Sequence, residues 1–470
     1  MLWLIQLKAT IGRIRVAVTV TRRSRSKTIG AGLATVLLGG GAVILVGPAL
    51  AGADGHGGHN HHTLYVAPGG SLSNDGTGCS DAQYSNIQSA VDAATQGDTV
   101  YVCDGTYDEQ LTISTSHLTL TGDGTNSVID PTAAVSTAMD FDSSAPLQSI
   151  VDVTKGTNDV TISNLKLDGS GLSGSSGVSG SGCGNPDFTG VAFQGASGAA
   201  VGLTVANVEL PPGLFYCASN PVVAIFVQSG PSGRADVTIA QNTITAYKNG
   251  IGCEDAGTRC QINDNTVSGT ASLPDHGPGY NGVEVLTGAT ANIEHNQIAN
   301  NDYTGGTNPY EPQADYATGI LLYAAAGNTD VGNNTLNNDQ IGVMLIHSDA
   351  NVHDNTISQP SGAIAGSVGV FALGCDVYCV YFNVAGGNEN DAINNNTISF
   401  PGTLATPTPG TVGVWVGDGA VASAPTPGYS NDPGNVQVQV NGNAITGAVN
   451  NIVVGPAATG QVTIGNGGND

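Results

Sequence analysis

The sequence predicts an all-β fold, a solenoid in which short strands stack coil upon coil. The first observation is a motif that returns along the chain: Asn, Thr and then Ile, Val or Leu. Its five closest copies begin at Asn242, Asn265, Asn334, Asn355 and Asn396, and looser copies lie at Asn164, Asn207, Asn296 and Asn443. The second is a Gly-aliphatic-x-aliphatic segment before most copies, as at residues 282–285. A repeat of this period is typical of stacked supersecondary units.

The third observation is composition. The chain has 470 residues with 68 Gly, and only 10% of its residues are charged, which suits short strands and tight turns better than helices. The shortest intervals between repeats, Asn242 to Asn265 and Asn334 to Asn355, give a bare coil of about 21–23 residues. We expect two or three strands per coil, with alternate side chains inward and successive coils about 4.8 Å apart. We expect each repeated Asn to take a left-handed turn and to bond neighbouring backbone groups, which is a structural role.

The first 51 residues read as a signal peptide. Seven of the 12 Lys and Arg residues precede residue 28, and no acidic residue precedes Asp54. An apolar run at 28–46 and a small-residue cleavage site at 48–51 follow. An uncleaved membrane anchor is the alternative. We expect a secreted protein that is monomeric and free of the membrane after cleavage.

Charge excludes one class of partner. The formal net charge is -25, and the segment after residue 51 is more acidic still, so nucleic acid binding is not expected. We divide the mature part into a His- and Gly-rich linker at 52–62, an N-terminal cap with the first coils at 63–149, and the β-helix repeats at 150–470.

The eight cysteines agree with an oxidising destination. Their spacing predicts four local disulfides: Cys79 with Cys103, Cys183 with Cys217, Cys253 with Cys260, and Cys375 with Cys379.

The start of the folded part carries a helix signal. Ser85 is a plausible N-cap, and Ile87, Ala90, Val91 and Ala94 recur with helical spacing. Strands are predicted at 64–66, 99–102, 105–107, 110–113 and 117–121.

Segment 84–124 carries a family resemblance through its stretches at 86–91, 97–102 and 105–109. It resembles the opening of pectin-lyase-like right-handed parallel β-helices, which pectinesterases share. The resemblance implies a right-handed parallel β-helix whose short N-terminal helix covers the end of the hydrophobic column. It ends after the first coils, because the catalytic motifs of pectinesterases, polygalacturonases and uronate epimerases are absent.

Aligning the coils on their Gly-aliphatic strands predicts an outward column that is largely apolar. Its members are Ala192, Phe226, Gly252, Glu284, Leu321, Met344, Phe371 and Trp415, with Tyr323, Ile346 and Leu373 in the next outward column. Such a stripe is normally covered or used. Three interpretations stay open: insertions 374–392 or 400–411 cover it, Phe371, Trp415 and Tyr323 stack on sugar rings, or the protein dimerises through it.

An acidic rim is predicted next to this column. Insertion 268–281 carries Asp275 and His276, and insertion 300–318 carries Tyr310, Glu311 and Asp315, all expected beside outward Glu284. The candidate catalytic residues are Asp275, His276, Glu284 and Asp315, with Tyr310 beside the aromatic residues as a substrate contact. Glu254, Asp255 and Glu311 are candidate ligands for calcium; no other cofactor is expected. An acidic loop pair without chemistry is the alternative.

A second outward column contains Asp264, His295, Asn333 and Asp354, with Glu294 and His353 beside it. Charge pairing or a loosely held cation is expected there, with Asp264 near His295.

These observations favour a secreted β-helix protein that binds, and as a hydrolase or lyase cleaves, extracellular polysaccharide. The alternative is a non-catalytic surface or structural module. A lyase of this fold usually needs Lys or Arg at its site. The alignment places none at the acidic rim, so a lyase is disfavoured unless calcium supplies the positive charge. The Lys and Arg residues after residue 51 are Lys155, Lys166, Arg234, Lys248 and Arg259.

Overall fold

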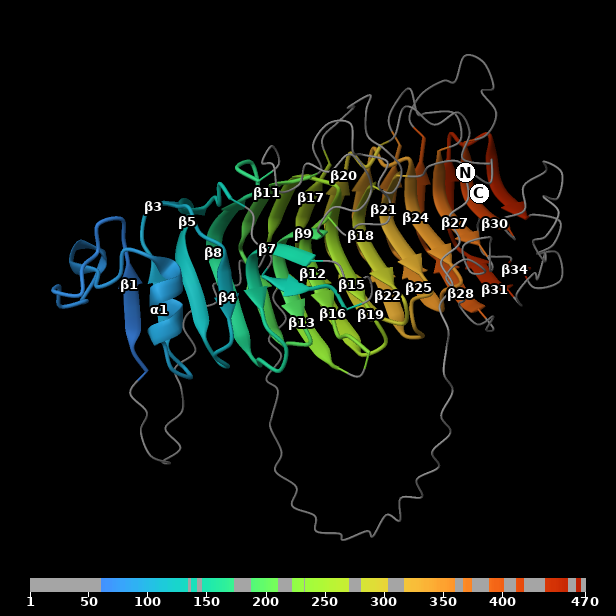
Figure 1. Cartoon of the computed structure of the whole chain (residues 1–470). Helices are drawn as coiled ribbons and strands as arrows, with labels where there is room; N and C mark the ends of the chain where they lie inside the picture. Colours follow the sequence, from blue (N-terminus) through green and yellow to red (C-terminus); the bar gives the residue numbers. More distant parts are fainter. Residues whose placement is uncertain are drawn as a thin grey trace, which may run out of the picture. The chain divides into compact units, whose positions relative to one another are not determined.

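A computed structural model of the chain describes most of the unit that spans His59–Asp470. The described residues are 61–133, 137–141, 146–172, 187–209, 222–231, 233–269, 280–302, 317–359, 367–373, 389–400, 411–417, 436–454 and 462–465. Their strands follow one another coil by coil in sequence order (Figure 1).

Most coils contribute three strands, one to each of three parallel stacks. The first stack consists of β1 (Thr63–Val66), β2 (Thr99–Val102), β5 (Thr119–Ile129), β8 (Val160–Asp168), β10 (Gly198–Val201), β13 (Ala235–Ala240), β16 (Thr258–Asn263), β19 (Thr290–Glu294), β22 (Thr329–Gly332), β25 (Ala350–His353), β28 (Glu389–Asn394), β31 (Val436–Asn441) and β34 (Val462–Ile464). The second consists of β3 (Gly105–Tyr107), the later parts of β5 and β8, β11 (Thr204–Val208), β14 (Thr243–Tyr247), β17 (Thr266–Ser268), β20 (Gln297–Ala299), β23 (Thr335–Asn337), β26 (Thr356–Ser358), β29 (Thr397–Ser399) and β32 (Ala444–Thr446).

The third stack is a separate sheet, here called the lateral sheet. It consists of β4 (Leu111–Ile113), β7 (Pro146–Val153), β9 (Asp187–Gln194), β12 (Val222–Gln228), β15 (Asn249–Glu254), β18 (Tyr280–Leu286), β21 (Ala317–Tyr323), β24 (Ile341–Ile346), β27 (Val368–Leu373), β30 (Val412–Gly417) and β33 (Asn450–Val454). The short strand β6 (Ala138–Met139) pairs antiparallel with β7.

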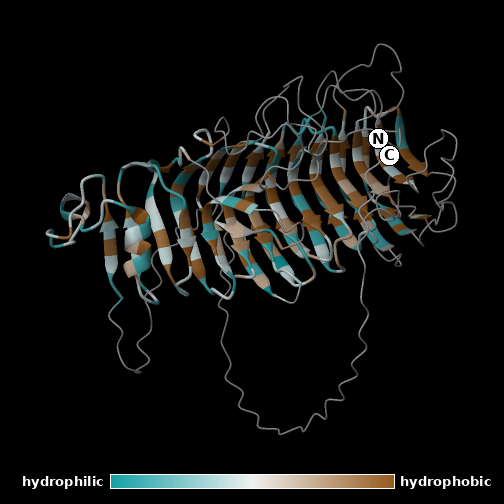
Figure 2. Cartoon of the chain, viewed as in Figure 1, coloured by the Kyte–Doolittle hydropathy of each residue, from teal (hydrophilic) through white to brown (hydrophobic). Residues whose placement is uncertain are grey.

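The inward side chains of all three stacks form one continuous core. Hydrophobic and hydrophilic residues alternate along many strands (Figure 2), as a pleated strand with one buried face requires. The predicted inward column of the lateral sheet is confirmed, because all of its members are fully buried: Val191, Ile225, Ile251, Val283, Ile320, Val343, Val370 and Val414.

A continuous asparagine ladder fixes the coils in register. Its members are Asn242, Asn265, Asn296, Asn334, Asn355, Asn396 and Asn443. At each step, the backbone N–H and the Nδ2 of one Asn donate to the Oδ1 of the next; from Asn334 to Asn355 the two distances are 2.9 and 3.0 Å. Nδ2 also donates to a carbonyl of an earlier coil, as from Asn334 to Ile293 at 2.8 Å. The predicted Asn ladder is therefore confirmed.

The backbone of the ladder differs from the expectation in one respect. The left-handed residue is the one before each Asn, such as Asp264 with φ 56° or Asp354 with φ 52°. The ladder Asn is left free to direct its amide along the stack. Asn164 and Asn207 are themselves left-handed, with φ 51° and 59°, and they are not ladder members. The corresponding ladder positions of the two coils before Asn242 hold the buried aliphatic residues Leu165 and Leu203.

Glycine occupies one position of most lateral-sheet strands, and Ala224 occupies the equivalent position in β12. A Cβ added at the glycine positions would lie 2.4–2.8 Å from a carbonyl oxygen of the following coil. The column comprises Gly190, Gly250, Gly282, Gly319, Gly342, Gly369 and Gly413. The Gly-aliphatic motif thus reflects close backbone approach between coils.

The N-terminal helix α1 spans Ile87–Ala93, where the sequence predicts it. Its N-cap is Asn86, and not Ser85, because the Asn86 side chain accepts a hydrogen bond from the Ser89 N–H at 2.8 Å. Ile87, Ala90 and Val91 are buried in the core. A role for α1 in covering the end of the column stays a prediction. A 3-10 turn, η1, lies at Cys79–Asp81.

Two of the four predicted disulfides are present, Cys79–Cys103 and Cys253–Cys260. The pairs Cys183–Cys217 and Cys375–Cys379 lie outside the described residues. Within the described part of the chain, no helix is long and apolar enough to cross a membrane. The four segment boundaries proposed from the sequence stay predictions.

The ladder leads to a stability prediction. We expect Asn334→Ala to lower the free energy of unfolding by on the order of 3 kcal/mol, since it strands buried N–H groups of Asn296 and the Ile293 carbonyl. Asn337→Ala, at an exposed position three residues on, is the control and should change it little. Chemical denaturation of both variants measures the difference; equal effects would show that the ladder does not stabilise the stack.

The glycine column leads to a second stability prediction. Gly319→Ala places a methyl group 2.8 Å from the Gly342 carbonyl oxygen and 2.7 Å from Leu336 Cδ2, so it should destabilise the protein by about 1–3 kcal/mol. Gly78→Ala is the matched control, because nothing lies within 4 Å of its added Cβ. Thermal unfolding compares the two, and a neutral Gly319→Ala would refute the steric explanation.

Candidate functional site

The outward column of the lateral sheet is buried over much of its length. Met344, Phe371 and Trp415 belong to a second hydrophobic cluster, separate from the main core, and Leu321 and Tyr323 pack against it. Phe371 is 1% exposed and Trp415 8% exposed, with ring centroids 4.9 Å apart. Both rings are therefore enclosed, which favours the interpretation that the stripe is covered, rather than sugar stacking on these two residues. Insertions 374–392 and 400–411, expected as covers, lie almost wholly outside the described residues.

Glu284 lies in the same column, on β18, and its side chain is also buried, with 4% exposure. Its Oε1 accepts from Asn249 Nδ2 at 3.0 Å, and its Oε2 accepts from Asn281 Nδ2 at 3.1 Å. Burial raises the pKa of Glu284 to about 7, against the opposing effects of Asn281, Lys248 and Asn249. The carboxyl can therefore exchange a proton near neutral pH, as a catalytic acid or base must.

Further hydrogen bonds hold the two carboxamides. Asn249, Asn281 and Thr318 are register partners on β15, β18 and β21. Thr318 Oγ1 donates to Asn281 Oδ1 at 2.5 Å, and the Asn281 N–H donates to Asn249 Oδ1 at 3.2 Å. With each Oδ1 engaged, both Nδ2 groups are directed at Glu284. The parallel register of the lateral sheet thus builds the carboxylate environment from three successive coils.

Lys248 corrects the expectation that no cation lies near this site. It immediately precedes β15, and its side chain is 1% exposed. Its charge acts on Glu284 and favours the ionised carboxylate. The alignment missed Lys248 because it considered only residues inside the strands.

The structure does not describe the other members of the predicted rim. Asp275, His276, Tyr310, Glu311 and Asp315 lie outside the described residues.

Of the predicted calcium ligands, Asp255 is engaged as a turn residue. Its φ is 78°, and its Oδ2 accepts from the Gly230 N–H at 2.9 Å. Glu254, at the end of β15, is half-buried. No group of three or more His, Cys, Asp and Glu suited to a metal occurs among the described residues. The calcium site stays a prediction, because Glu311 is outside that part of the chain.

Four residues with raised pKa values were missed from the sequence: Glu209 and Asp302 after the second-stack strands β11 and β20, Tyr280 at the start of β18, and Asp339 before β24. Burial is the main cause that raises the pKa of each. Asp339 is buried, and its Oδ1 accepts from Asn301 Nδ2 at 2.8 Å, while Asn301 Oδ1 accepts from Tyr247 Oη at 2.8 Å. The buried Asp339 therefore lies in low-dielectric surroundings. Glu209, Asp302 and Asp339 lie just outside the repeat strands, where the alignment of the strands does not mark them.

Asp152, on β7, is another buried acid that the sequence pattern did not reveal. Its side chain is 0% exposed, and neither oxygen has a hydrogen-bond partner among the described residues. Burial alone raises its pKa to about 7. Four strand steps separate it from Glu284 in the column, roughly 19 Å, too far for the paired carboxylates of a glycosidase.

The second outward column contains one ion cluster. His353 lies between two carboxylates, with Nε2 3.0 Å from Asp330 Oδ2 and Nδ1 2.9 Å from Asp354 Oδ2. These hydrogen bonds raise its pKa against the effect of burial. The predicted charge pairing of this column therefore involves His353, whereas no described ion pair joins Asp264 to His295.

Comparison with known proteins bears on the fold. Residues 224–423 match the family model described as a right-handed beta helix region. The matched residues are less than half of the chain, and together with the parallel stacks of the described strands they support a right-handed parallel β-helix fold. The predicted β-helix fold is therefore confirmed. None of the curated proteins matches the sequence.

Several solved β-helix structures are similar. The GH136 lacto-N-biosidase from Eubacterium ramulus is 13% identical, with a TM-score of 0.49 over 82% of this chain and 68% of the other. The mannuronan C-5 epimerase AlgE6 A-module from Azotobacter vinelandii is 14% identical, with a TM-score of 0.44 over 81% and 94%. The DFA-IIIase from Arthrobacter chlorophenolicus A6, solved without its lid, is 14% identical, with a TM-score of 0.46 over 84% and 92%.

The buried Asp152 makes stability depend on pH. Its pKa is about 7 in the folded protein, against an ordinary value of 3.8. The folded state therefore holds the proton more tightly, so the contribution is favourable below about pH 4 and is lost as pH rises to 7. Asp152→Asn should remove a few kcal/mol of this pH-dependent loss.

Urea unfolding at pH 5 and pH 8 measures it. Asp75→Asn, at an exposed acid outside the lateral sheet, is the control and should follow the unmodified protein. An identical pH dependence in Asp152→Asn would show that the carboxyl is not held protonated.

Proposed function

We propose that this β-helix protein is secreted and acts on extracellular polysaccharide, with Glu284 as the group that transfers a proton. The observation that carries the proposal is a carboxyl with a pKa of about 7, held between Asn249 and Asn281 and next to Lys248. Raised carboxyl pKa values at buried, polar positions are characteristic of catalytic acids.

The chemistry depends on the protonation state of Glu284. Near pH 6 the carboxyl is largely protonated and can donate to the oxygen of a breaking glycosidic bond. Once ionised, the same group can accept a proton. Lys248 would stabilise negative charge next to Glu284, which suits an acidic sugar. Because a lyase needs such a cation, a lyase mechanism is proposed as an alternative to hydrolysis. Asp275, His276 and Asp315 stay part of the proposal as further acid–base groups.

The cellular setting rests on separate features. The basic and apolar N-terminal segment supports export, and the disulfides Cys79–Cys103 and Cys253–Cys260 suit an oxidising compartment. We also propose that the protein is monomeric and that α1 covers the end of the hydrophobic column. If calcium binds, its proposed ligands are Glu254, Asp255 and Glu311.

A non-catalytic structural module is the second candidate. It is favoured by the burial of Glu284 and Lys248, at 4% and 1% exposure, and by that of the Phe371 and Trp415 rings. Under this alternative, the Glu284 cluster fixes the packing of the lateral sheet and has no substrate.

A cleavage screen tests the first candidate. Purified protein is incubated with neutral and uronic polysaccharides, with and without calcium, and new reducing ends and unsaturated products are measured separately. Glu284→Gln should lower the turnover of the cleaved polymer by about 100-fold or more. Activity should fall as pH rises past about 7 if Glu284 is the acid.

Glu294→Gln is the matched control, on β19 and outside the cluster, and should retain activity. Thermal unfolding shows whether each variant is folded. Full activity in a folded Glu284→Gln variant would remove Glu284 from the mechanism. Absence of both cleavage and binding for every polymer would favour the structural module.

A further inference from the structure

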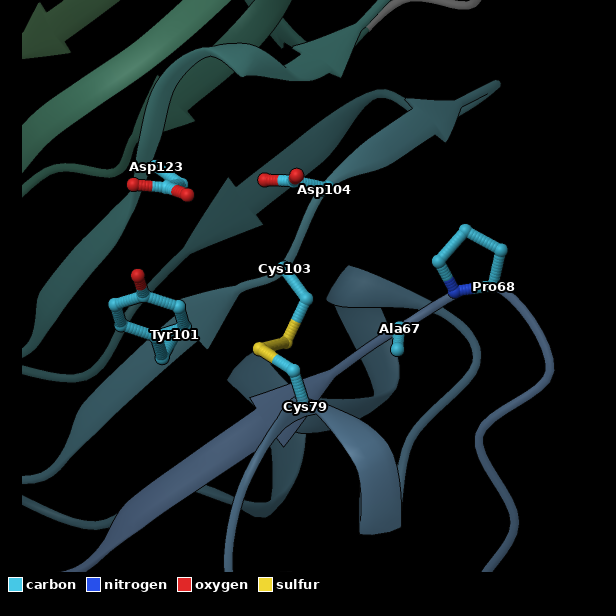
Figure 3. A pocket seen from close by; sticks show the side chains of 7 residues that line it. All are labelled: Ala67, Pro68, Cys79, Tyr101, Cys103, Asp104 and Asp123. Atoms are coloured by element: carbon cyan, nitrogen blue, oxygen red, sulfur yellow. A yellow bond between two sulfur atoms is a disulfide. The ribbon is translucent and has the colours of Figure 1, made fainter.

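A cleft of about 480 Å³ lies at the N-terminal coils, well before the Glu284 cluster in the chain. It is lined by Ala67, Pro68, Cys79, Tyr101, Cys103, Asp104 and Asp123. Figure 3 shows the Asp104 and Asp123 carboxyl groups along one side, with the disulfide on the other and Tyr101 and Pro68 at the flanks. The Cys79–Cys103 bond ties η1 to the end of β2, so one wall is covalently fixed.

An accessible aromatic pair forms the tyrosine flank. Tyr65 on β1 and Tyr101 on β2 are register partners, and their ring centroids lie 5.5 Å apart at 49°. Both side chains are only half-buried. They contrast with Phe371 and Trp415, whose rings are enclosed. These first coils therefore present two partly accessible tyrosine side chains beside the cleft.

The carboxylates of the cleft are available to a ligand. Asp104 and Asp123 are both exposed, and neither side chain has a hydrogen-bond partner or counter-ion among the described residues. Burial, followed by the charges of Asp123 and Asp104, raises the pKa of Tyr101, so both carboxylates act on the space next to its ring. None of the residues that line the cleft is Lys, Arg or His. The site is thus anionic with an apolar floor.

We propose that this cleft binds a protonated amino sugar, a pyranose that carries a free ammonium group. The ammonium group would lie between Asp104 and Asp123, where it gains two charge-assisted hydrogen bonds. The apolar face of the pyranose would lie against Tyr101, where a nearby cation also interacts favourably with the aromatic ring.

Other ligand classes fit the cleft less well. A uronic acid would be repelled by the two carboxylates. A divalent cation would find only two carboxylate side chains, fewer than the oxygen ligands that calcium takes. A neutral sugar could stack on Tyr101 but would leave the excess negative charge unbalanced. Binding at this cleft does not require Glu284 to be catalytic, so the two proposals can fail separately.

Equilibrium binding tests the proposal with the full mature protein and defined probes. Isothermal titration or ligand-observed NMR compares a glucosamine trisaccharide with its N-acetylated form, a glucuronic acid oligosaccharide, and free lysine. The glucosamine trisaccharide should bind best, and its affinity should fall as salt is added. Asp104→Asn with Asp123→Asn should weaken it about tenfold, and Tyr101→Leu about threefold.

Asp92→Asn is the control, since it removes one carboxylate charge from α1 outside the cleft, and should bind normally. Thermal unfolding verifies that all variants are folded. If Tyr101→Leu does not fold, the Asp→Asn variants still test the site, because Asn has nearly the same shape as Asp. Equal binding of the N-acetylated trisaccharide, or of lysine, would overturn the assignment to an amino sugar. Absence of binding, or binding unaffected by the Asp→Asn changes, would overturn the site.

Discussion

The asparagine ladder is the interaction on which the rest of the structure depends. Each step places two donors of one coil on a single oxygen of the next, inside the protein where water cannot replace them. Since the register of one corner is fixed, the strands on either side stack without slipping. The columns of the lateral sheet follow from this register, including the one that holds Glu284. A site built from Asn249, Asn281 and Thr318 on three coils exists because those coils cannot shift.

The sequence predicted the structural positions that repeat from coil to coil, but not the burial of residues that occur in a single coil. The ladder asparagines recur from Asn242 to Asn443 and the inward valines and isoleucines recur along the lateral sheet, so their alignment alone gave the register that the structure confirms. The outward position of Glu284 followed from the same alignment. Its burial did not, because exposure on that face depends on packing outside the repeat. Lys248 and Asp339 lie just before lateral-sheet strands. The alignment of the strands does not include these positions, so it could not predict their burial. Asp152 is the single acid of β7, and the next three strands have no acid in its column.

Three buried acids whose pKa is raised lie on the lateral sheet or directly before one of its strands, whereas the buried Asp98, Asp168 and Asp391 lie on or beside the first stack. Glu284 is held by two carboxamides and a cation, Asp339 by Asn301, and Asp152 by no described partner. A carboxyl in such surroundings costs free energy once it is ionised. A stack bonded along its whole length can tolerate that cost, because local loss at one coil does not separate its neighbours.

The contrast between the two acidic regions argues for different roles. Around Glu284, the acid is enclosed, has polar partners on both oxygens and titrates near neutrality, which suits proton transfer or packing. Around Tyr101, the acids are open to solvent and have no described partner, which suits retention of a charged ligand. A β-helix can carry both, since each coil contacts only its neighbours and distant coils are free to differ. The repeat that makes the fold predictable therefore also makes each site a local matter of the few residues that depart from it.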